Sequence, residues 1–388
     1  MSQMHRRSFL RAALAGTAAA ALPSIPQFAL ADNLVKRMKS SDDFEPSISG
    51  LPSIPAVNWS AVGATAPTAI SASGNSLPAA DVVVICWAEA EWAAIEHVFV
   101  QSTSSMSYSS SSSDSWSDWV KYTKDMPSIS SSEDWTYWGY YRLVSINGTR
   151  VLLFKSNTHL DWPGQSYLSA LIGQFITYVK PSLIMSTGTA GGSRLTDHIG
   201  TINVTNAATM YSSSEPSSSW PTYTSTFQPS WSIVQKSGFS SLLYAIPASS
   251  SNLSSLASQF NKYYDTNYST STLNADSLCT PTTLPALNNL VPNGTPLLTA
   301  STFVTANTSG DYANYSVVEM DDAVIAQVCQ QNNVPFCSVR NVSDPAQNAS
   351  LPSSVHGNWG SAVYDVFGFY TSYNGAVVAW AIIAGMAA

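Results

Sequence analysis

Charged side chains are scarce in this chain: Asp, Glu, Lys and Arg together make up 10% of its 388 residues. The formal net charge is −8. A net negative protein repels the phosphate backbone of nucleic acids unless a local basic patch overrides the repulsion. The composition therefore favours a globular protein, with 45% hydrophobic residues for its core, and predicts that nucleic acid is not a partner.

Cysteine is also rare, with four residues at positions 86, 279, 329 and 337. Their spacing matches no zinc motif, so we expect neither a metal ion nor another cofactor. An oxidising compartment would permit a disulfide. Cys86, Cys329 and Cys337 lie in apolar segments, however, and buried free thiols are the interpretation that we favour for them.

The N-terminal apolar run is too short to cross a membrane. Paired arginines in His5–Arg11 precede the Ala-rich stretch Ala12–Leu22 and an Ala-Leu-Ala cleavage site at 29–31. This order is typical of a twin-arginine signal peptide over residues 1–31. Its removal leaves 13 basic and 24 acidic residues, a net charge of −11. We therefore expect a protein that is periplasmic or secreted and has no membrane span.

The remaining chain is expected to form a single domain over residues 81–388. Residues 32–80 are rich in Pro, Ser, Gly and Ala and are predicted to be an extended leader. Ser-rich segments at about 102–118 and 211–250 are predicted to be loop insertions.

Strand and helix patterns alternate along this domain, which predicts an α/β fold. Asn147-Gly148 between two strand patterns predicts a tight hairpin turn. The sequence thus favours three α/β/α layers with a central mixed, largely parallel sheet. The expected strands are 81–86, 137–146, 149–155, 183–186, 297–300 and 334–339, and the expected helices are 88–95, 167–178, 254–264, 323–329 and 363–386.

Two acidic clusters at 318–322 and 340–344 stand at the ends of one apolar unit. The unit comprises the expected helix 323–329 and the expected strand 334–339, and it returns the second cluster to the same end of the sheet as the first. In a chain so poor in charge, paired acids at this position indicate a site that could hold a sugar and donate a proton.

Four motifs resemble the nucleoside phosphorylase superfamily, in particular its methylthioadenosine/S-adenosylhomocysteine nucleosidase branch. They are the Gly-rich Ser186–Gly192, Val318–Cys329, Asn333–Phe336 and Arg340–Asp344. Asp321 and Asp344 are 23 residues apart, as in that family. The resemblance covers 81–96, 151–155, 180–210 and 297–344, and it implies a nucleoside substrate and a homo-oligomer, either a dimer or a trimer.

The resemblance implies two catalytic carboxyl groups. Asp344 matches the general acid that protonates the purine at N7, and its alternative role is to cap a loop. Glu91 matches the carboxylate that activates the attacking water, and its alternative role is that of an ordinary acid in the first turn of a helix. Glu89 is a competing candidate for the base.

The same resemblance implies a sugar site. Met320 matches a residue that lies against the ribose, and Asp321 matches the acceptor of its 2′- and 3′-hydroxyl hydrogen bonds. The family usually has Glu at the second position, so the side chain here is one methylene shorter. Glu319 matches a neighbouring acid of the pocket.

A base and nucleophile site is implied as well. Thr189, Ala190 and Gly191 match positions beside the water and the base. Phe303 matches the aromatic ring that stacks on the base, although a plain core role is the alternative, and Val304 matches the backbone that reads the purine edge.

Two further residues complete the implied set. Arg340 would order the acids at the sugar end through charge-assisted hydrogen bonds, or would form a structural ion pair. Ser343, next to the general acid, is included among the substrate-binding residues.

The expected reaction is hydrolysis of the N-glycosidic bond of a purine nucleoside. Phosphorylases of the superfamily have a Gly-Asp-Pro turn after the first strand, whereas this chain has the acidic Cys86–Glu91 there. Two alternatives stay open: a binding protein without catalysis, and a phosphorylase that uses Arg142, Arg150 or Arg194. The segment 157–164 replaces the Gly-Ile-Gly-Lys turn of the nucleosidases, and its His159, Asp161 and Trp162 would contact substrate or only pack the loop.

Overall fold

The computed structural model describes most of the chain after the signal peptide. The described residues are 44–107, 118–127, 135–194, 197–274, 283–301, 310–344 and 351–386. Cys279, Phe303 and Val304 therefore lie outside them.

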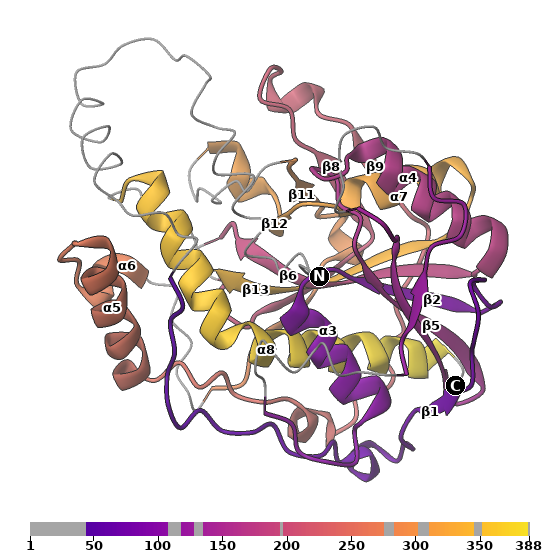
Figure 1. Ribbon diagram of the computed structural model, residues 1–388, viewed down its shortest axis with the longest axis horizontal. Coiled ribbons are helices and arrows are strands. Elements are labelled where there is room, and N and C mark those ends of the chain that lie inside the picture. Colours follow the sequence, from indigo (N-terminus) through magenta and orange to yellow (C-terminus); the bar gives the residue numbers. More distant parts are fainter. Residues whose placement is uncertain are drawn as a thin grey trace.

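One mixed sheet of thirteen strands forms the centre of the protein (Figure 1). Its main order is β1-β4-β5-β2-β6-β12-β11-β8-β9, and β13 pairs with both β6 and β7. The strands are β1 (Thr68–Ile70), β2 (Val82–Cys86), β3 (Val120–Tyr122), β4 (Gly139–Ile146), β5 (Thr149–Ser156), β6 (Leu183–Gly192), β7 (Ile202–Thr205), β8 (Ala207–Met210), β9 (Thr222–Thr224), β10 (Leu287–Asn289), β11 (Leu297–Thr299), β12 (Val317–Glu319) and β13 (Phe336–Asp344).

Parallel pairing joins β5, β2, β6 and β13, then β8, β11 and β12, and also β7 and β10. The remaining pairs are antiparallel, among them the expected hairpin of β4 and β5, where Asn147 and Gly148 have φ of 50° and 88°. Positive φ at both positions is what a tight hairpin turn of this kind requires. The predicted mixed α/β sheet is therefore confirmed.

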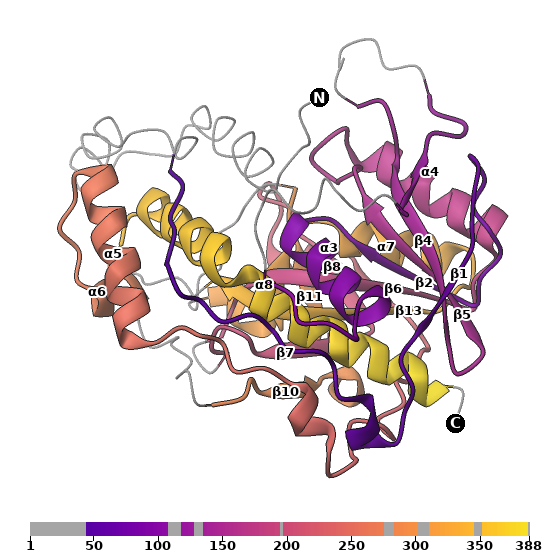
Figure 2. The same cartoon turned by 60° about the horizontal axis from the view of Figure 1, so that its bottom comes forward.

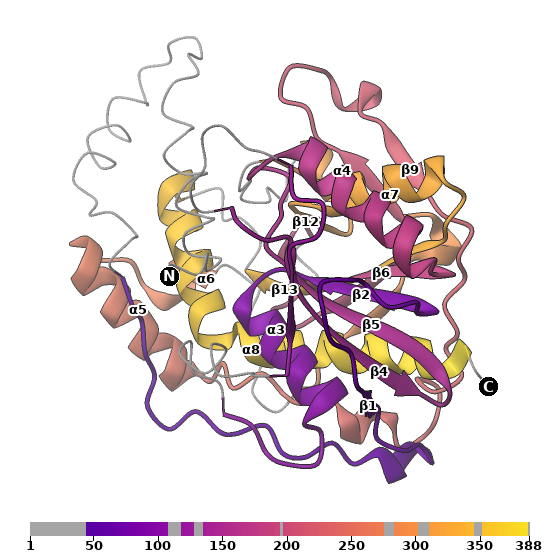
Figure 3. The same ribbon diagram turned by 45° about the vertical axis from the view of Figure 1, so that its right-hand side comes forward.

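Helices cover both faces of the sheet (Figure 3). Helices α3 (Glu89–Ile95) and α8 (Ser353–Met386) pack on one face, and α4 (Gln165–Gln174) and α7 (Asp322–Gln331) pack on the other. Each layer has its own apolar cluster, because strands buried on both faces need apolar partners on each side. Helix α5 (Ser250–Tyr264), followed by the short α6 (Thr270–Asn274), lies beside α8 (Figure 2).

Two strands are longer than the sequence predicts. β6 continues through the Gly-rich segment to Gly192, which was expected to be a turn, because β13 and then β12 pair with these residues. β13 likewise continues to Asp344. The consequence is that the candidate residues of both motifs stand on strands and are fixed by backbone hydrogen bonds.

Helix α8 begins at Ser353, ten residues earlier than expected. Among the described residues it is the one helix with a segment, Gly357–Met386, that is long and apolar enough by length and composition to cross a membrane. Its apolar window is completely buried within the protein. The apolar sequence is thus used in packing α8 against the sheet and α3.

The thiols of Cys86, Cys329 and Cys337 are free and buried, as expected. Burial raises the pKa of each thiol above its ordinary value. Such thiols behave as small apolar side chains and are poor nucleophiles.

The described part of the leader, residues 44–80, lies along the domain. Ile54, Val57 and Trp59 are buried in the core cluster of α8, and β1 pairs with β4 at one edge of the sheet. Trp59 packs against Trp380 of α8 with a ring separation of 4.2 Å.

Candidate active site

The candidate residues gather where several strands end. β2, β6 and β13 run parallel, so their carboxyl ends lie at one edge. β12 runs antiparallel to β6, with Val317 opposite Gly192 and Val318 opposite Gly191, and its last residue, Glu319, returns toward the middle of β6. This topology brings together residues as far apart in the sequence as Glu91 and Asp344, which are 253 positions apart.

Glu91, in the first turn of α3, has a buried carboxylate with four hydrogen bonds. The backbone N–H groups of Trp87 and Ala88 donate to Oε2, each at 2.9 Å. Thr189 donates to Oε1 twice, from its backbone N–H at 2.7 Å and from its hydroxyl at 2.6 Å. The carboxylate therefore both caps α3 and joins this helix to β6.

This carboxylate is held in its ionised form. Burial alone would raise the pKa of Glu91, but the Arg340 charge and the hydrogen bonds from Thr189 and Ala88 outweigh burial and lower the pKa below its ordinary value. Charge and hydrogen bonding to the ionised form act in this direction for any carboxyl group. Glu91 can thus accept a proton over a wide pH range. Glu89, the competing candidate for the base, is buried as well.

Gly188 is required for this arrangement, although no role was expected for it beyond its place in the Gly-rich motif. A Cβ atom at this position would lie 2.6 Å from the carboxyl carbon of Glu91, where no atom fits. The absent side chain allows the carboxylate to approach β6. The Gly-rich motif thus supplies space at residue 188 and donors at Thr189.

Arg340, on β13, is surrounded by acids and is itself 3% exposed. Its Nη2 donates to Glu319 at 3.1 Å and to Ser186 at 2.7 Å. Asp322 accepts from both Nε and Nη2, at 3.0 and 2.5 Å. Asp322 is fully buried and was not among the expected site residues, because at the sequence level it is simply the first residue of a helix.

Glu319 shares this cluster. Burial raises its pKa, the neighbouring Asp322 raises it further, Arg340 opposes the shift, and the result is a pKa of about 8. The backbone N–H groups of Asp321 and Asp322 and the hydroxyl of Thr299 donate to its carboxyl group. Glu319 therefore keeps its proton to a higher pH than an ordinary Glu side chain does.

Asp344 is the last residue of β13 and is 4% exposed. The Ser343 hydroxyl lies 3.1 Å from its Oδ1 and 3.5 Å from the carbonyl of Ala190. Gly360 of α8 faces the same carboxyl group, since a Cβ there would lie 3.6 Å from its carbon. Ser343 therefore contacts the candidate acid and the backbone of β6.

Strand β6 sets the separation of the two candidate catalytic groups. Glu91 is bound to Thr189, and Asp344 pairs with Gly191, two residues further along the same strand. At a rise of about 3.3 Å per residue these anchor points are about 7 Å apart. Glu91 on α3 and Asp344 on β13 are thus attached to nearby positions of the same strand, a spacing that one small molecule can bridge.

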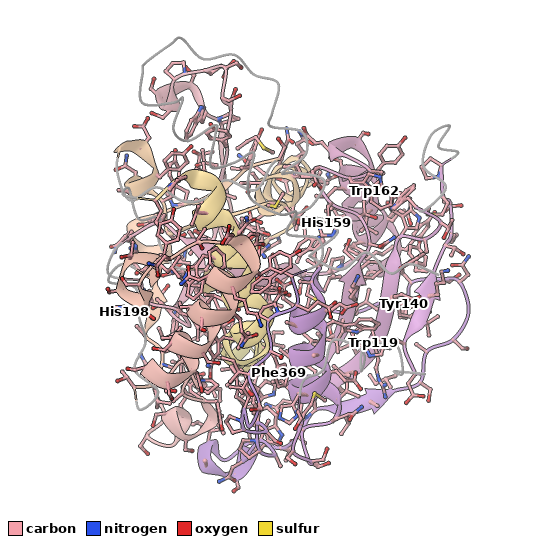
Figure 4. The ribbon with its side chains drawn as sticks, turned by 60° about the vertical axis from the view of Figure 1, so that its left-hand side comes forward. Trp119, Tyr140, His159, Trp162, His198 and Phe369 are labelled. Atoms are coloured by element: carbon pink, nitrogen blue, oxygen red, sulfur yellow. The ribbon has the colours of Figure 1, made fainter. Side chains whose placement is uncertain are left out.

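Asp321 is bound by the segment that replaces the Gly-Ile-Gly-Lys turn. The backbone N–H of Leu160 donates to its Oδ1 at 2.8 Å, and Nδ1 of His159 lies 3.3 Å from its Oδ2. His159 and Trp162 lie close together in the loop between β5 and α4 (Figure 4), where the His159 N–H donates to the Trp162 carbonyl. Met320, beside Asp321, is half-buried.

Asp161 lies in the same loop and has an unusual environment. Burial and the nearby Asp321 raise its pKa to about 8, and its buried Oδ1 has no hydrogen-bond partner among the described residues. Near neutral pH its carboxyl group is therefore largely protonated and can donate a hydrogen bond. The loop thus brings one histidine and one protonated acid to the sugar-side candidate, Asp321.

The cations near Glu91 are Arg340 and Lys155. Lys155 is 5% exposed, and burial lowers its pKa although Cys86, Glu89 and Glu91 oppose that shift.

The three arginines of the phosphorylase alternative are paired with acids or lie at another end of the sheet. Arg142 pairs with Asp118 at 3.3 Å, Arg194 pairs with Asp197 at 2.8 Å, and Arg150 lies at the opposite end of β5. The described residues contain no cluster of acids, histidines or cysteines that could hold a metal ion.

One family model matches the chain, at its N-terminal signal, and several solved structures are similar to it at low sequence identity. The model of the twin-arginine translocation pathway signal sequence matches residues 3–23, which confirms the export signal. The signal directs the protein to the periplasm or outside the cell. No curated protein sequence matches the chain.

The similar solved structures include a futalosine hydrolase and nucleosidases. Futalosine hydrolase of Helicobacter pylori is 12% identical, with 78% of this chain and 96% of that chain covered and a TM-score of 0.41. The methylthioadenosine/S-adenosylhomocysteine nucleosidase of Neisseria meningitidis is 14% identical over 78% of this chain and 98% of that chain, with a TM-score of 0.41. The S-adenosylhomocysteine nucleosidase of Streptococcus pyogenes is 14% identical over 79% of this chain and 97% of that chain, with a TM-score of 0.41. The branch that the motifs resemble is thus represented among them.

Proposed function

We propose that the chain is an exported hydrolase that cleaves the N-glycosidic bond of a purine nucleoside to a free base and a sugar. The observation that carries this proposal is the pair of carboxyl groups anchored on β6, ionised Glu91 at Thr189 and Asp344 at Gly191. Paired acids on either side of a glycosidic bond are the groups that its hydrolysis needs.

In the proposed reaction, Glu91 removes a proton from water as the water oxygen attacks C1′ of the ribose. The bond between C1′ and N9 breaks, and its electron pair leaves with the purine. Asp344 donates its proton to N7, so the base departs as a neutral molecule. Thr189 serves the first step, because its hydroxyl rotates about a single bond and can give up its place at Oε1 to water or relay a proton.

The acceptor in this proposal is water and not phosphate. A phosphate site requires several donors or cations that converge on the anion. Here Glu91 already accepts the N–H groups at the start of α3, and Arg340 is already paired with Asp322. The carboxylates would repel a phosphate dianion.

The sugar end of the proposed site comprises Met320 and Asp321. Asp321 still has acceptor capacity beside its bonds to Leu160 and His159, since a carboxylate offers about four lone-pair positions. His159 and Asp161 belong to this end of the site in the proposal. Base contacts by Phe303 and Val304 remain an implication of the motif resemblance.

A second candidate function is nucleoside binding without turnover. The observation that favours it is the saturation of Glu91, whose two oxygens accept four protein donors. A binding protein uses such a carboxylate only to fix α3. The two functions differ in whether Thr189 yields its place to water.

The test is incubation of the mature protein with inosine, adenosine and methylthioadenosine, with and without phosphate, followed by measurement of the free base. Release without phosphate supports hydrolysis, whereas release that requires phosphate overturns it. Binding without release of base supports the second candidate. Asp344→Asn should bind the same nucleoside but lose turnover, and unchanged turnover would remove Asp344 from the mechanism.

A further inference from the structure

The guanidinium of Arg340 is held by several hydrogen bonds along its Nε–Nη2 edge and by a single long one at Nη1. Asp322 accepts from Nε and Nη2, and the Ser186 hydroxyl accepts from Nη2 as well. Nη1, by contrast, has one long hydrogen bond among the described residues, 3.4 Å to the Thr189 carbonyl. The Trp87 ring covers one face of the guanidinium at 5.2 Å.

Asp322 is itself fixed by a dedicated polar set. Ser186 on β6 donates to Oδ1 at 2.5 Å, and Ser338 on β13 donates to Oδ2 at 2.6 Å. All three side chains are fully buried. Four hydrogen bonds from two strands and one arginine leave this carboxylate no second orientation, because moving it would leave buried donors without acceptors.

We propose that Asp322 is a positioning residue that fixes the Arg340 guanidinium by its Nε–Nη2 edge, so that Nη1 faces Thr189 and the carboxylate of Glu91. The inference rests on the proposed function, because the group that Nη1 would contact is the nucleophilic water or the sugar of that reaction. Glu319 cannot replace Asp322 in this role, since it meets Arg340 through Nη2 alone at 3.1 Å. Two parallel bonds define the plane of a guanidinium, and a single bond does not.

The charge of Asp322 also acts on its neighbours. The titratable groups that face the cluster are Glu91 on α3, Glu319 and Asp321 at the end of β12, Cys86 on β2, Lys155 on β5 and Cys337 on β13. Of these, Glu319 responds most directly, because Asp322 helps to raise its pKa to about 8. Loss of the Asp322 charge should therefore let Glu319 ionise at lower pH and become the counter-ion of Arg340.

The experiment compares Asp322→Asn with Glu96→Gln, a matched loss of a buried carboxylate that bonds Trp119 and Gln101 away from the site. For Asp322→Asn we expect kcat to fall about 10- to 100-fold with KM changed by less than about 3-fold, because the loss concerns orientation. The titration of Glu319, followed by carbon-13 NMR of labelled Glu, should move to lower pH. Glu96→Gln should change neither quantity.

The two readouts separate this inference from the proposed function. If the wild-type protein releases no base, the proposed function fails, and the Glu319 titration still tests whether Asp322 organises the cluster. An unchanged titration, or an unchanged kcat in an active protein, overturns the positioning role. If Asp322→Asn does not fold, Ser338→Ala removes one hydrogen bond to Oδ2 and should show the same changes at smaller size, and their absence there also overturns the proposal.

Discussion

Two acidic regions of the candidate site differ in how their carboxyl groups are held. Around Arg340, the carboxylates of Glu91 and Asp322 each accept four hydrogen bonds, from β6, β13 and the residues just before α3. At the proposed sugar side, Asp321 is bound by a loop through His159 and Leu160, and Oδ1 of Asp161 has no hydrogen-bond partner among the described residues.

The difference separates what is rigid from what can adapt. Acids bound on several sides by regular structure keep one orientation and can set the chemistry. Acids bound by a loop can change partners when a ligand arrives, so this region is suited to choosing the substrate. Variants should therefore affect the rate in the first region and the apparent affinity in the second.

The largest effect is expected for Glu91→Gln. An amide in this place removes the base and sets an NH₂ group against N–H donors, so kcat should fall by about 10²- to 10⁴-fold. Because the pKa of Glu91 is lowered, wild-type activity should not lose this base until the pH is below its ordinary value of 4.5. Base release measured against pH checks both points.

Glu89→Gln is the control for this prediction, since it changes the neighbouring acid of the same helical turn. It should keep most of the activity. If Glu89→Gln were inactive and Glu91→Gln active, the base would be Glu89 and the assignment to Glu91 would be wrong.

Arg340→Met should have the largest effect on stability. It leaves Asp322 and Glu319, whose side chains are 0% and 2% exposed, without their shared cation. Removal of one partner from a buried ion pair costs about 3–5 kcal/mol. Urea unfolding monitored by tryptophan fluorescence measures the loss.

The matched change is Arg142→Met, which breaks an ion pair with the exposed Asp118. Exposed pairs contribute about 0–1 kcal/mol, so this variant should unfold nearly as the wild type does. Equal losses in the two variants would contradict the rigid, buried character assigned to the Arg340 region.

The features that the sequence could predict are those that depend on residues close together in the chain. Local patterns predicted the hairpin at Asn147-Gly148, the alternation of strands and helices, and the helix after Asp321, because each depends on neighbouring residues. The motif resemblance assigned Thr189 to the nucleophile site and Arg340 to the acids at the sugar end. In the structure Thr189 donates to Glu91, and Arg340 donates to Glu319.

Other features depend on contacts that no local pattern contains. Asp322 is bonded to Ser186 across 136 positions, and His159 reaches Asp321 across 162. The extension of β6 through the Gly-rich segment arises from pairing with β12 and β13, which is a tertiary effect. The only sequence signal for Asp322 was a second consecutive acid in a chain poor in charge.

A smaller effect concerns the pH dependence of stability. The pKa of Glu319 and that of Asp161 are each raised to about 8, so the folded state holds protons that the unfolded state releases above about pH 4.5. Stability should therefore fall as pH rises from about 5 to 8, because the unfolded state then binds fewer protons than the folded state does. Chemical denaturation at several pH values measures the slope.

Glu319→Gln and Asp161→Asn should each remove one part of this slope, since neither amide titrates. The two regions can thus be compared by the same measurement. A slope that is unchanged in both variants would show that neither acid holds a proton in the folded protein.

The smallest effect is expected at the loop, for His159→Ala. This change removes the contact to Asp321 Oδ2, while the Leu160 N–H still holds Oδ1. One hydrogen bond contributes about 0.5–1.5 kcal/mol, so KM for the nucleoside should change by about 2- to 10-fold with kcat nearly constant. His198→Ala, at an exposed position, is the control (Figure 4). A fall in kcat with unchanged KM would place His159 with the rigid region that sets the rate, because only a contact made in the transition state alone lowers kcat in that way.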